Sequence, residues 1–201
     1  MMTNQNVKKY LAEALGAFTL TLVVALSIAV PFPVPTPLLA GLVLGLFVYT
    51  IGHLSGSHIN PAVTIGLWSI KKITAGQAAL YIIFQLAGAW AAGILVSSVV
   101  GITPLTVSGD FIIGFAEALG TFFFTFGIAS VVYGKVSDVM SGIVIGGSLF
   151  LGIVVAVTLS SNGVLNPAVA MGIGSFNVMY LLGPIVGCVA GMQAYKYLCS
   201  K

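Results

Sequence analysis

The heptapeptide Asn60-Pro61-Ala62-Val63-Thr64-Ile65-Gly66 returns 106 positions later as Asn166-Pro167-Ala168-Val169-Ala170-Met171-Gly172. Asn is a favoured helix N-cap residue and Pro is favoured at the first helical position, so each copy predicts the start of a helix. Each copy lies in a segment too short to cross a bilayer alone, since a crossing takes about 20 residues. The repeat therefore predicts two short helices whose starts are buried in the fold.

A second stretch is repeated upstream of each copy. Ala12-Glu13-Ala14-Leu15-Gly16-Ala17-Phe18 is echoed by Ala116-Glu117-Ala118-Leu119-Gly120-Thr121-Phe122, which divides the chain into halves at about residues 8–105 and 110–199. Each half is expected to contain three crossings. Because three is odd, the second half must enter the membrane from the opposite side, and the repeats are inverted. The two short helices then meet near the middle of the bilayer.

The composition is that of an integral membrane protein. Of the 201 residues, 59% are hydrophobic and 5% are charged, whereas soluble domains carry about 25% charged residues. Six apolar segments are long enough to cross the bilayer: Tyr10–Val30, Leu38–Leu54, Gln77–Val100, Phe111–Tyr133, Met140–Leu159 and Met179–Leu198. They leave no room for a separate soluble domain, so we predict a single transmembrane domain, residues 1–201, with the lipid bilayer as its partner.

The basic residues predict the orientation. With both termini inside, all seven lysines fall on the inner side of the membrane, in agreement with the positive-inside rule. They are Lys8, Lys9, Lys71, Lys72, Lys135, Lys196 and Lys201. Scattered in this way they form no patch of the kind that binds nucleic acid, and no nucleic-acid partner is expected. We expect a protein of the cell membrane with both termini in the cytoplasm.

The doubled Asn-Pro-Ala, preceded in its first copy by Gly52-His53-Leu54-Ser55-Gly56-Ser57-His58-Ile59, resembles the aquaporin and aquaglyceroporin channels of the major intrinsic protein family. The resemblance covers nearly the whole chain. It implies an all-α membrane protein, a right-handed bundle of six transmembrane helices with two re-entrant half-helices in an inverted repeat. It further implies a homotetramer with one pore in each subunit and no cofactor.

The segments before Asn60 and Asn166 are expected to line the pore, because irregular backbone at membrane depth is tolerated only where protein covers it or a wet cavity adjoins it. In the aquaporin-like arrangement they offer a ladder of carbonyl acceptors: Gly56, Ser57, His58, Ile59, Asn162, Gly163, Val164 and Leu165. Each Asn side-chain oxygen should cap its own helix and leave the NH₂ group for passing molecules. The two helix N-termini, with roughly +0.5 charge each, should repel cations and protons.

Glu13 and Glu117 are carboxylates inside predicted crossings, where an acid is by default a functional hypothesis. They resemble the family's buried glutamates, which support the re-entrant loops through hydrogen bonds, and His53 and His58 are similarly interpreted as loop-holding residues. The alternative is a proton relay, which would make the chain an ion-coupled secondary transporter of a small solute. No cysteine or acid lies near the two histidines in sequence, so no metal site is predicted.

The outer constriction departs from the family's pattern. Most relatives carry Arg three residues after the second Asn, whereas this chain has Val169 there and no Arg at all. Counting along the family pattern puts the other three filter positions at Ala40, Val154 and Gly163. Because a guanidinium supplies both donors and charge, this set predicts a wide, apolar and uncharged filter.

The sequence thus predicts a passive channel for water and small neutral solutes such as glycerol, urea, hydrogen peroxide or ammonia. The substrate indications are divided. Val169 is similar to the residue in a plant vacuolar-membrane subgroup that passes urea and hydrogen peroxide, whereas Ala170 resembles water channels. An enzyme is not indicated, because no nucleophile with a nearby base and no cofactor loop is present. An ion channel made leaky by the missing Arg is a further alternative.

Overall fold

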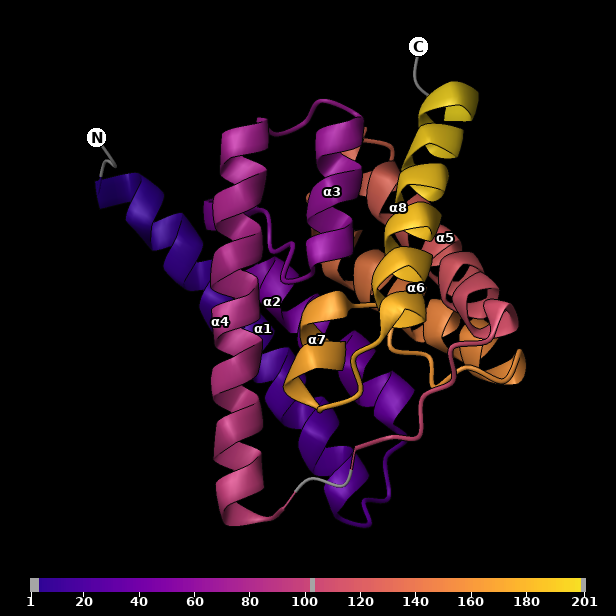
Figure 1. Cartoon of the computed structure of the whole chain (residues 1–201). Helices are drawn as coiled ribbons and strands as arrows, with labels where there is room; N and C mark the ends of the chain where they lie inside the picture. Colours follow the sequence, from indigo (N-terminus) through magenta and orange to yellow (C-terminus); the bar gives the residue numbers. More distant parts are fainter. Residues whose placement is uncertain (1–3, 102–103, 200–201) are drawn as a thin grey trace.

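The computed structural model describes residues 4–101 and 104–199, and in these residues it contains eight helices (Figure 1). Six are long and apolar enough to cross a membrane: α1 (Asn4–Ala29), α2 (Thr36–Ser55), α4 (Ala75–Val99), α5 (Phe111–Val132), α6 (Asp138–Thr158) and α8 (Val178–Cys199). Two are short, α3 (Pro61–Ser69) and α7 (Pro167–Gly172). The predicted all-α fold with six crossings and two half-helices is confirmed.

The ends of the crossings differ from the sequence prediction by only one or two residues, apart from the start of α1. This helix begins at Asn4 rather than at Tyr10 and so includes Lys8 and Lys9. The apolar pattern marks only the part of a helix that lies in the bilayer. Lysine is itself a good helix former, and its charged end can remain in water while its stem covers apolar surface, so the helix continues beyond that pattern.

The two halves repeat the same order of elements, α1 to α4 and α5 to α8. Helix α1 packs against α4, α5 packs against α8, and α2 and α6 pack together between the halves. Glycines permit the closest approaches: a Cβ atom on Gly88 would lie 2.1 Å from the carbonyl oxygen of Ala14, and one on Gly187 would lie 2.0 Å from that of Ala118. Equivalent small residues therefore set the helix spacing in both halves.

Both chain termini lie at the same end of the bundle, the end from which α3 enters (Figure 1). The loop after α3 adjoins the end of α5, because Lys72 Nζ donates to the carbonyl of Val132 and lies 4.7 Å from the ring centre of Tyr133. The lysines of the described residues therefore gather at this terminal end. Lys201 lies outside the described residues. The loop between α4 and α5 lies at the opposite end (Figure 1).

Helices α3 and α7 enter the bundle from opposite ends and meet at their N-termini (Figure 1). The halves are therefore inverted, as the odd number of crossings per repeat requires. This arrangement brings two irregular segments, one before each half-helix, into the middle of the molecule. Their polar backbone groups need partners there.

Candidate pore

The two half-helices begin with the same cap. Asn60 and Asn166 have extended backbone, with φ of −155° and −148°, and each places its Oδ1 over the first turn of its own helix. Asn60 accepts the N–H of Ala62 at 2.8 Å, and Asn166 accepts those of Ala168 and Val169 at 3.0 and 3.4 Å. Pro occupies the first helical position, where no N–H is needed.

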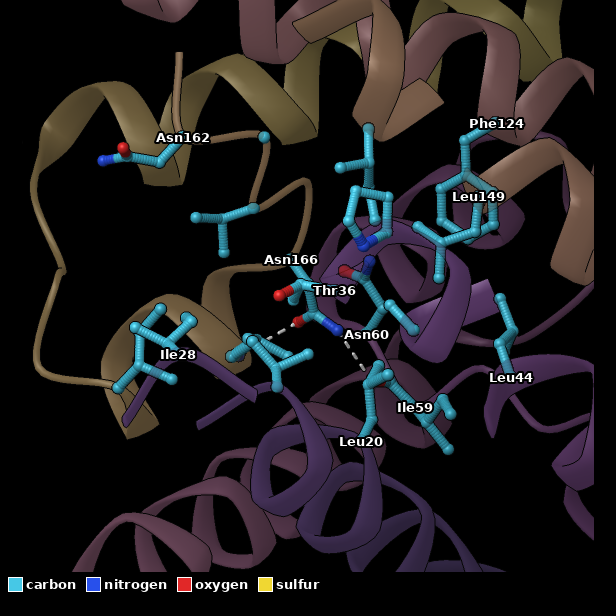
Figure 2. Close-up of a pocket in the computed structure, with 18 of the residues that line it drawn as sticks. Leu20, Ile28, Thr36, Leu44, Ile59, Asn60, Phe124, Leu149, Asn162 and Asn166 are labelled. Atoms are coloured by element: carbon cyan, nitrogen blue, oxygen red, sulfur yellow. Dashed lines mark hydrogen bonds between the residues drawn. The ribbon is translucent and has the colours of Figure 1, made fainter. Parts of the chain in front are cut away.

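The same two Asn residues also join the half-helices to each other. Asn60 Nδ2 donates to the carbonyl of Leu165 at 2.9 Å. Asn166 Nδ2 donates to the carbonyl of Ile59 at 3.0 Å (Figure 2). An amide nitrogen carries two N–H groups. One N–H of each Asn is therefore committed to the opposite segment, and the sequence-based expectation of a wholly free NH₂ group was wrong. The second N–H of each remains available to the adjoining space.

A cavity of about 290 Å³, here called the outer cavity, adjoins this junction on the side away from the termini. Its lining comes from both halves and is mostly apolar: Leu20, Val24, Ile28, Ala40, Leu44, Phe124, Leu149, Ile153, Val157 and Val169 are among the residues that form it. The polar groups along its wall are few and include Asn60, Asn166 and Asn162 (Figure 2). A small molecule inside it would meet hydrogen-bonding groups at the junction and along residues 162–164.

A second cavity of about 610 Å³, the inner cavity, opens toward the terminal end. Lys72, Asp138 and His53 belong to its wall, and so do Ser57 and His58. His58 lines both cavities, so it marks the place where they approach each other. The two cavities and the Asn pair together form a candidate path from one end of the bundle to the other.

Glu13 holds the segment before α3. Its Oε1 accepts the hydroxyl of Ser55 at 2.7 Å and the N–H of His58 at 3.0 Å, and its Oε2 accepts the N–H of Ile59 at 2.6 Å and the amide of Gln85 at 2.7 Å. We call these residues the first brace. These bonds satisfy buried backbone N–H groups of the re-entrant segment. Hydrogen bonds to a charged acceptor contribute about 1.5–3 kcal/mol each.

Glu117 holds the segment before α7 in the same way, and its partners form the second brace. Ser161 donates its hydroxyl and Val164 its N–H to Oε1, while the N–H of Leu165 donates to Oε2 at 2.7 Å. The side chain is fully buried, like that of Glu13. Among the described residues no side-chain amide reaches Glu117, because α8 has Pro184 at the position equivalent to Gln85.

The first brace extends into a polar network that sequence reasoning missed. Gln85 donates to Thr64 Oγ1 at 3.0 Å as well as to Glu13, and the His58 ring nitrogen Nδ1 lies 3.2 Å from the same hydroxyl. Gln85 is fully buried on α4. A lone glutamine in an apolar crossing is a signal that could have identified it, since a buried amide needs partners.

The predicted carbonyl ladder is only partly available. In the described structure no hydrogen bond uses the carbonyls of Gly56, Ser57, His58, Asn162, Gly163 or Val164. The remaining two, those of Ile59 and Leu165, accept from the opposite Asn. Both residues have left-handed backbone, with φ of 41° and 53°. The free carbonyls therefore end at His58 and Val164, two residues before each Asn.

The predicted outer filter contains one misplaced residue. Ala40, Gly163 and Val169 line the outer cavity, but Val154 does not and is 37% exposed on the outside of α6. Ile153 lines the cavity instead, and a Cβ atom on Gly163 would lie 3.0 Å from its Cγ2. One residue turns a helix by about 100°, so a counting error of one removes the side chain from the wall. We call Ala40, Ile153, Gly163 and Val169 the outer ring.

His53 does not support the loop. It lies exposed near the end of α2 and lines the inner cavity, and no hydrogen bond to its side chain is found in the described residues. His58 is the histidine in contact with the brace: its ring is buried and packs 4.8 Å from the ring of Tyr81. Tyr81 in turn donates to the carbonyl of Ser55 at 2.7 Å.

Comparison with known proteins identifies the class. The profile of the major intrinsic protein family matches residues 1–195. "Aquaporin AqpM" of Methanothermobacter thermautotrophicus is 34% identical over 185 residues, covering 80% of this chain and 75% of that protein. "Glycerol uptake facilitator protein-like 6" of Lactiplantibacillus plantarum is 33% identical over 219 residues, covering 96% of this chain and 99% of that protein.

The fold has a counterpart among solved structures. The aquaglyceroporin from Plasmodium falciparum superposes with a TM-score of 0.73 at 21% identity, covering 96% of this chain and 95% of that one. Inverted repeats with half-helices meeting at a cavity thus define a membrane channel, a passive pathway and not an enzyme. The chain belongs to the major intrinsic protein family.

Proposed function

We propose that this protein is a passive channel for water and small neutral solutes such as glycerol, urea, hydrogen peroxide or ammonia, with a wide outer filter that lacks Arg. The observation that carries the proposal is the junction of Asn60 and Asn166, which both line the outer cavity and use one N–H each to join the two half-helices. Apolar walls elsewhere offer few competing sites, so a neutral solute can pass without being held.

The outer ring supports the breadth of this substrate range. Its members Ala40, Ile153, Gly163 and Val169 carry no charge and no hydrogen-bonding side chain. An Arg at the position of Val169 would occupy space and supply a fixed positive charge. Without it, a solute larger than water meets less steric hindrance at this point. The relatives named for water and for glycerol fit the same range.

The bonding of Glu13 and Glu117 favours a channel over an ion-coupled transporter. A coupling carboxylate must exchange protons with the transport path. Both side chains are fully buried and accept hydrogen bonds from the re-entrant segments. Protonation would remove acceptors on which the fold of these segments depends, so a supporting role is the better account.

The membrane setting follows from the same features. We propose an inverted repeat of residues 8–105 and 110–199 within one channel domain, 1–201, in the cell membrane with both termini in the cytoplasm. The lysines at the terminal end support this orientation. A homotetramer with one pore per subunit is proposed from the family membership.

Reconstitution tests the proposal. Proteoliposomes exposed to a step in sucrose or glycerol are followed by stopped-flow light scattering, with empty liposomes as the control. We expect faster shrinkage in sucrose, and in glycerol a shrinkage followed by rapid re-swelling as the solute enters. Flux should be linear in solute concentration and indifferent to pH or sodium gradients. Saturable uptake driven by such a gradient would instead support the transporter.

A further inference from the structure

The two halves of the chain are related by a pseudo-two-fold axis, so each residue of the outer ring has an equivalent residue in the other half. Ser55 and Ser161, at the ends of the α2 and α6 segments, donate to the two brace carboxylates and correspond at a spacing of 106. A Cβ atom on Gly41 or Gly146 would meet the carbonyl oxygen of the other residue, which pairs α2 with α6 at a spacing of 105. The two Asn-Pro-Ala-Val segments correspond at 106. Ala40, Ile153, Gly163 and Val169 are therefore equivalent to Ile145, Val48, Ser57 and Val63.

All four equivalent residues line the inner cavity. We call Val48, Ser57, Val63 and Ile145 the inner ring. Two members are buried like their counterparts: Val63 is 2% exposed and Val169 3%, while Ile145 is 8% exposed and Ala40 3%. Both half-helices thus present a Val at the third position after the Asn, and neither ring has a charged member.

Ser57 is the one residue of the two rings with a polar side chain. It is 4% exposed, and its hydroxyl has no hydrogen-bond partner in the described structure. Its φ is 50°, a left-handed conformation that glycine adopts readily and other residues rarely adopt. Its counterpart Gly163 has φ of 66°, so glycine would suit the backbone at this position.

The backbone of Ser57 is held in the same way as that of Gly163. The N–H of Ser57 donates to Ser55 Oγ at 3.1 Å, and that of Gly163 donates to Ser161 Oγ at 3.1 Å. The brace therefore imposes this conformation whatever the side chain is. Ser57 thus keeps a backbone conformation that is unfavourable for serine, and its hydroxyl has no protein partner beside the cavity. Together these features indicate that the side chain interacts with molecules that pass through the cavity.

We propose that the inner ring is a second selectivity filter in series with the outer ring, and that Ser57 is its specificity-determining contact. In the structure this hydroxyl is buried; on rotation of the side chain toward the inner cavity it forms a hydrogen bond with water or with a hydroxyl or amide group of a small neutral solute. This inference rests on the proposed channel function. It means that discrimination between solutes is shared by the two ends of the pore.

Matched substitutions at the two rings test the proposal in proteoliposomes. Val63→Phe and Val169→Phe enlarge equivalent side chains, and the double variant combines them. Each single variant is expected to lower glycerol flux about tenfold, which is about 1.4 kcal/mol of added barrier, with a smaller loss of water flux. Resistances in series add, so the double variant should be about twofold slower for glycerol than either single variant. Size-exclusion profile and thermal unfolding in detergent check the fold.

Ser57→Ala removes only the hydroxyl and tests the polar contact separately. The loss of one neutral hydrogen bond predicts about a threefold drop in the ratio of glycerol flux to water flux. Ser98→Ala, at an exposed position on α4, is the control and should leave both fluxes unchanged. If Val63→Phe does not reconstitute, the ratio of glycerol flux to water flux in Ser57→Ala tests the second filter by itself.

The outcomes separate this inference from the proposed function. A wild-type protein without water or glycerol flux overturns both, because the rings then have nothing to select. If the wild type conducts and Val169→Phe responds while Val63→Phe and Ser57→Ala keep the wild-type ratio, the outer ring is the sole filter. In that case the proposal of a second filter is wrong, whereas the proposed channel function is unaffected.

Discussion

The two braces share a backbone pattern and differ in their side chains. Glu13 and Glu117 each accept the N–H groups of two successive residues and the hydroxyl of a serine. The first brace adds Gln85 and, through it, Thr64 and His58. The equivalent positions of the second brace are Pro184, Ala170 and Val164.

Comparison of the two braces identifies the groups that the fold of the re-entrant segments requires. The shared bonds satisfy backbone N–H groups that would otherwise be buried without partners, so they belong to the fold itself. The additional network around Gln85 belongs to one half only. It lies beside the segment that forms the wall of the inner cavity, and it fixes His58, the residue that lines both cavities.

The largest effect is expected from removing one carboxylate oxygen. Both oxygens of Glu13 accept two donors, so Glu13→Gln leaves two donors facing an NH₂ group in either orientation. We expect a loss of about 3 kcal/mol or more in the free energy of unfolding, measured by thermal or denaturant unfolding in detergent.

Glu117→Gln is the matched variant in the second half. Among the described residues, the N–H of Leu165 is the one donor to its Oε2, so the amide can turn its NH₂ group toward this single donor. We expect about half the loss of Glu13→Gln. Equal losses for the two variants would show that the donor count does not determine the strength of the braces.

An effect smaller than that of Glu13→Gln is expected for Gln85→Leu, which keeps the volume of the side chain but removes its polar groups. Glu13 then loses one charged hydrogen bond, and Thr64 loses a donor, at a cost of about 2 kcal/mol in unfolding free energy. The same measurement on Glu13→Gln/Gln85→Leu should show non-additivity, because both residues belong to one network. Strict additivity would mean that they act independently.

The next prediction concerns transport through the outer ring. Val169→Arg adds a long cationic side chain to a wall position of the outer cavity that is 3% exposed. Glycerol or urea flux is expected to fall about tenfold more than water flux, a difference of about 1.4 kcal/mol in barrier height. Val169→Leu is the uncharged control and should change the ratio little. Equal losses of water and solute flux in Val169→Arg would contradict a wide filter.

The smallest effect is expected at His53. The side chain is exposed and forms no hydrogen bond in the described structure, so His53→Ala should change the unfolding free energy by no more than about 0.5 kcal/mol. His58→Ala removes a buried ring next to Tyr81 and Thr64 and should cost at least about 2 kcal/mol. Unfolding midpoints of the two variants, compared side by side, check this contrast.

The fold could be predicted from the sequence because its signals are local. Apolar length marks the six crossings, and the Asn-Pro pair marks each half-helix start, since capping depends on neighbouring residues. The odd number of crossings per repeat then requires inversion. The start of α1 was placed too late because apolar content says nothing about a helix that continues into water.

The details of the site depend on contacts between distant segments. Gln85 is 72 positions from Glu13, and no local pattern pairs them. Val154 was predicted as a filter residue by counting, whereas Ile153 lines the cavity, because a single step along a helix changes the face. The bonds from Asn60 and Asn166 to the opposite segments also require the two half-helices to be positioned together.

The central claim is that two half-helices meeting at Asn60 and Asn166 form a passive path for water and small neutral solutes. Stopped-flow light scattering of proteoliposomes in a glycerol gradient tests it most directly. The account predicts shrinkage and re-swelling much faster than in empty liposomes, unchanged when a pH gradient is imposed. Kinetics equal to those of empty liposomes, or uptake that requires the pH gradient, would contradict it.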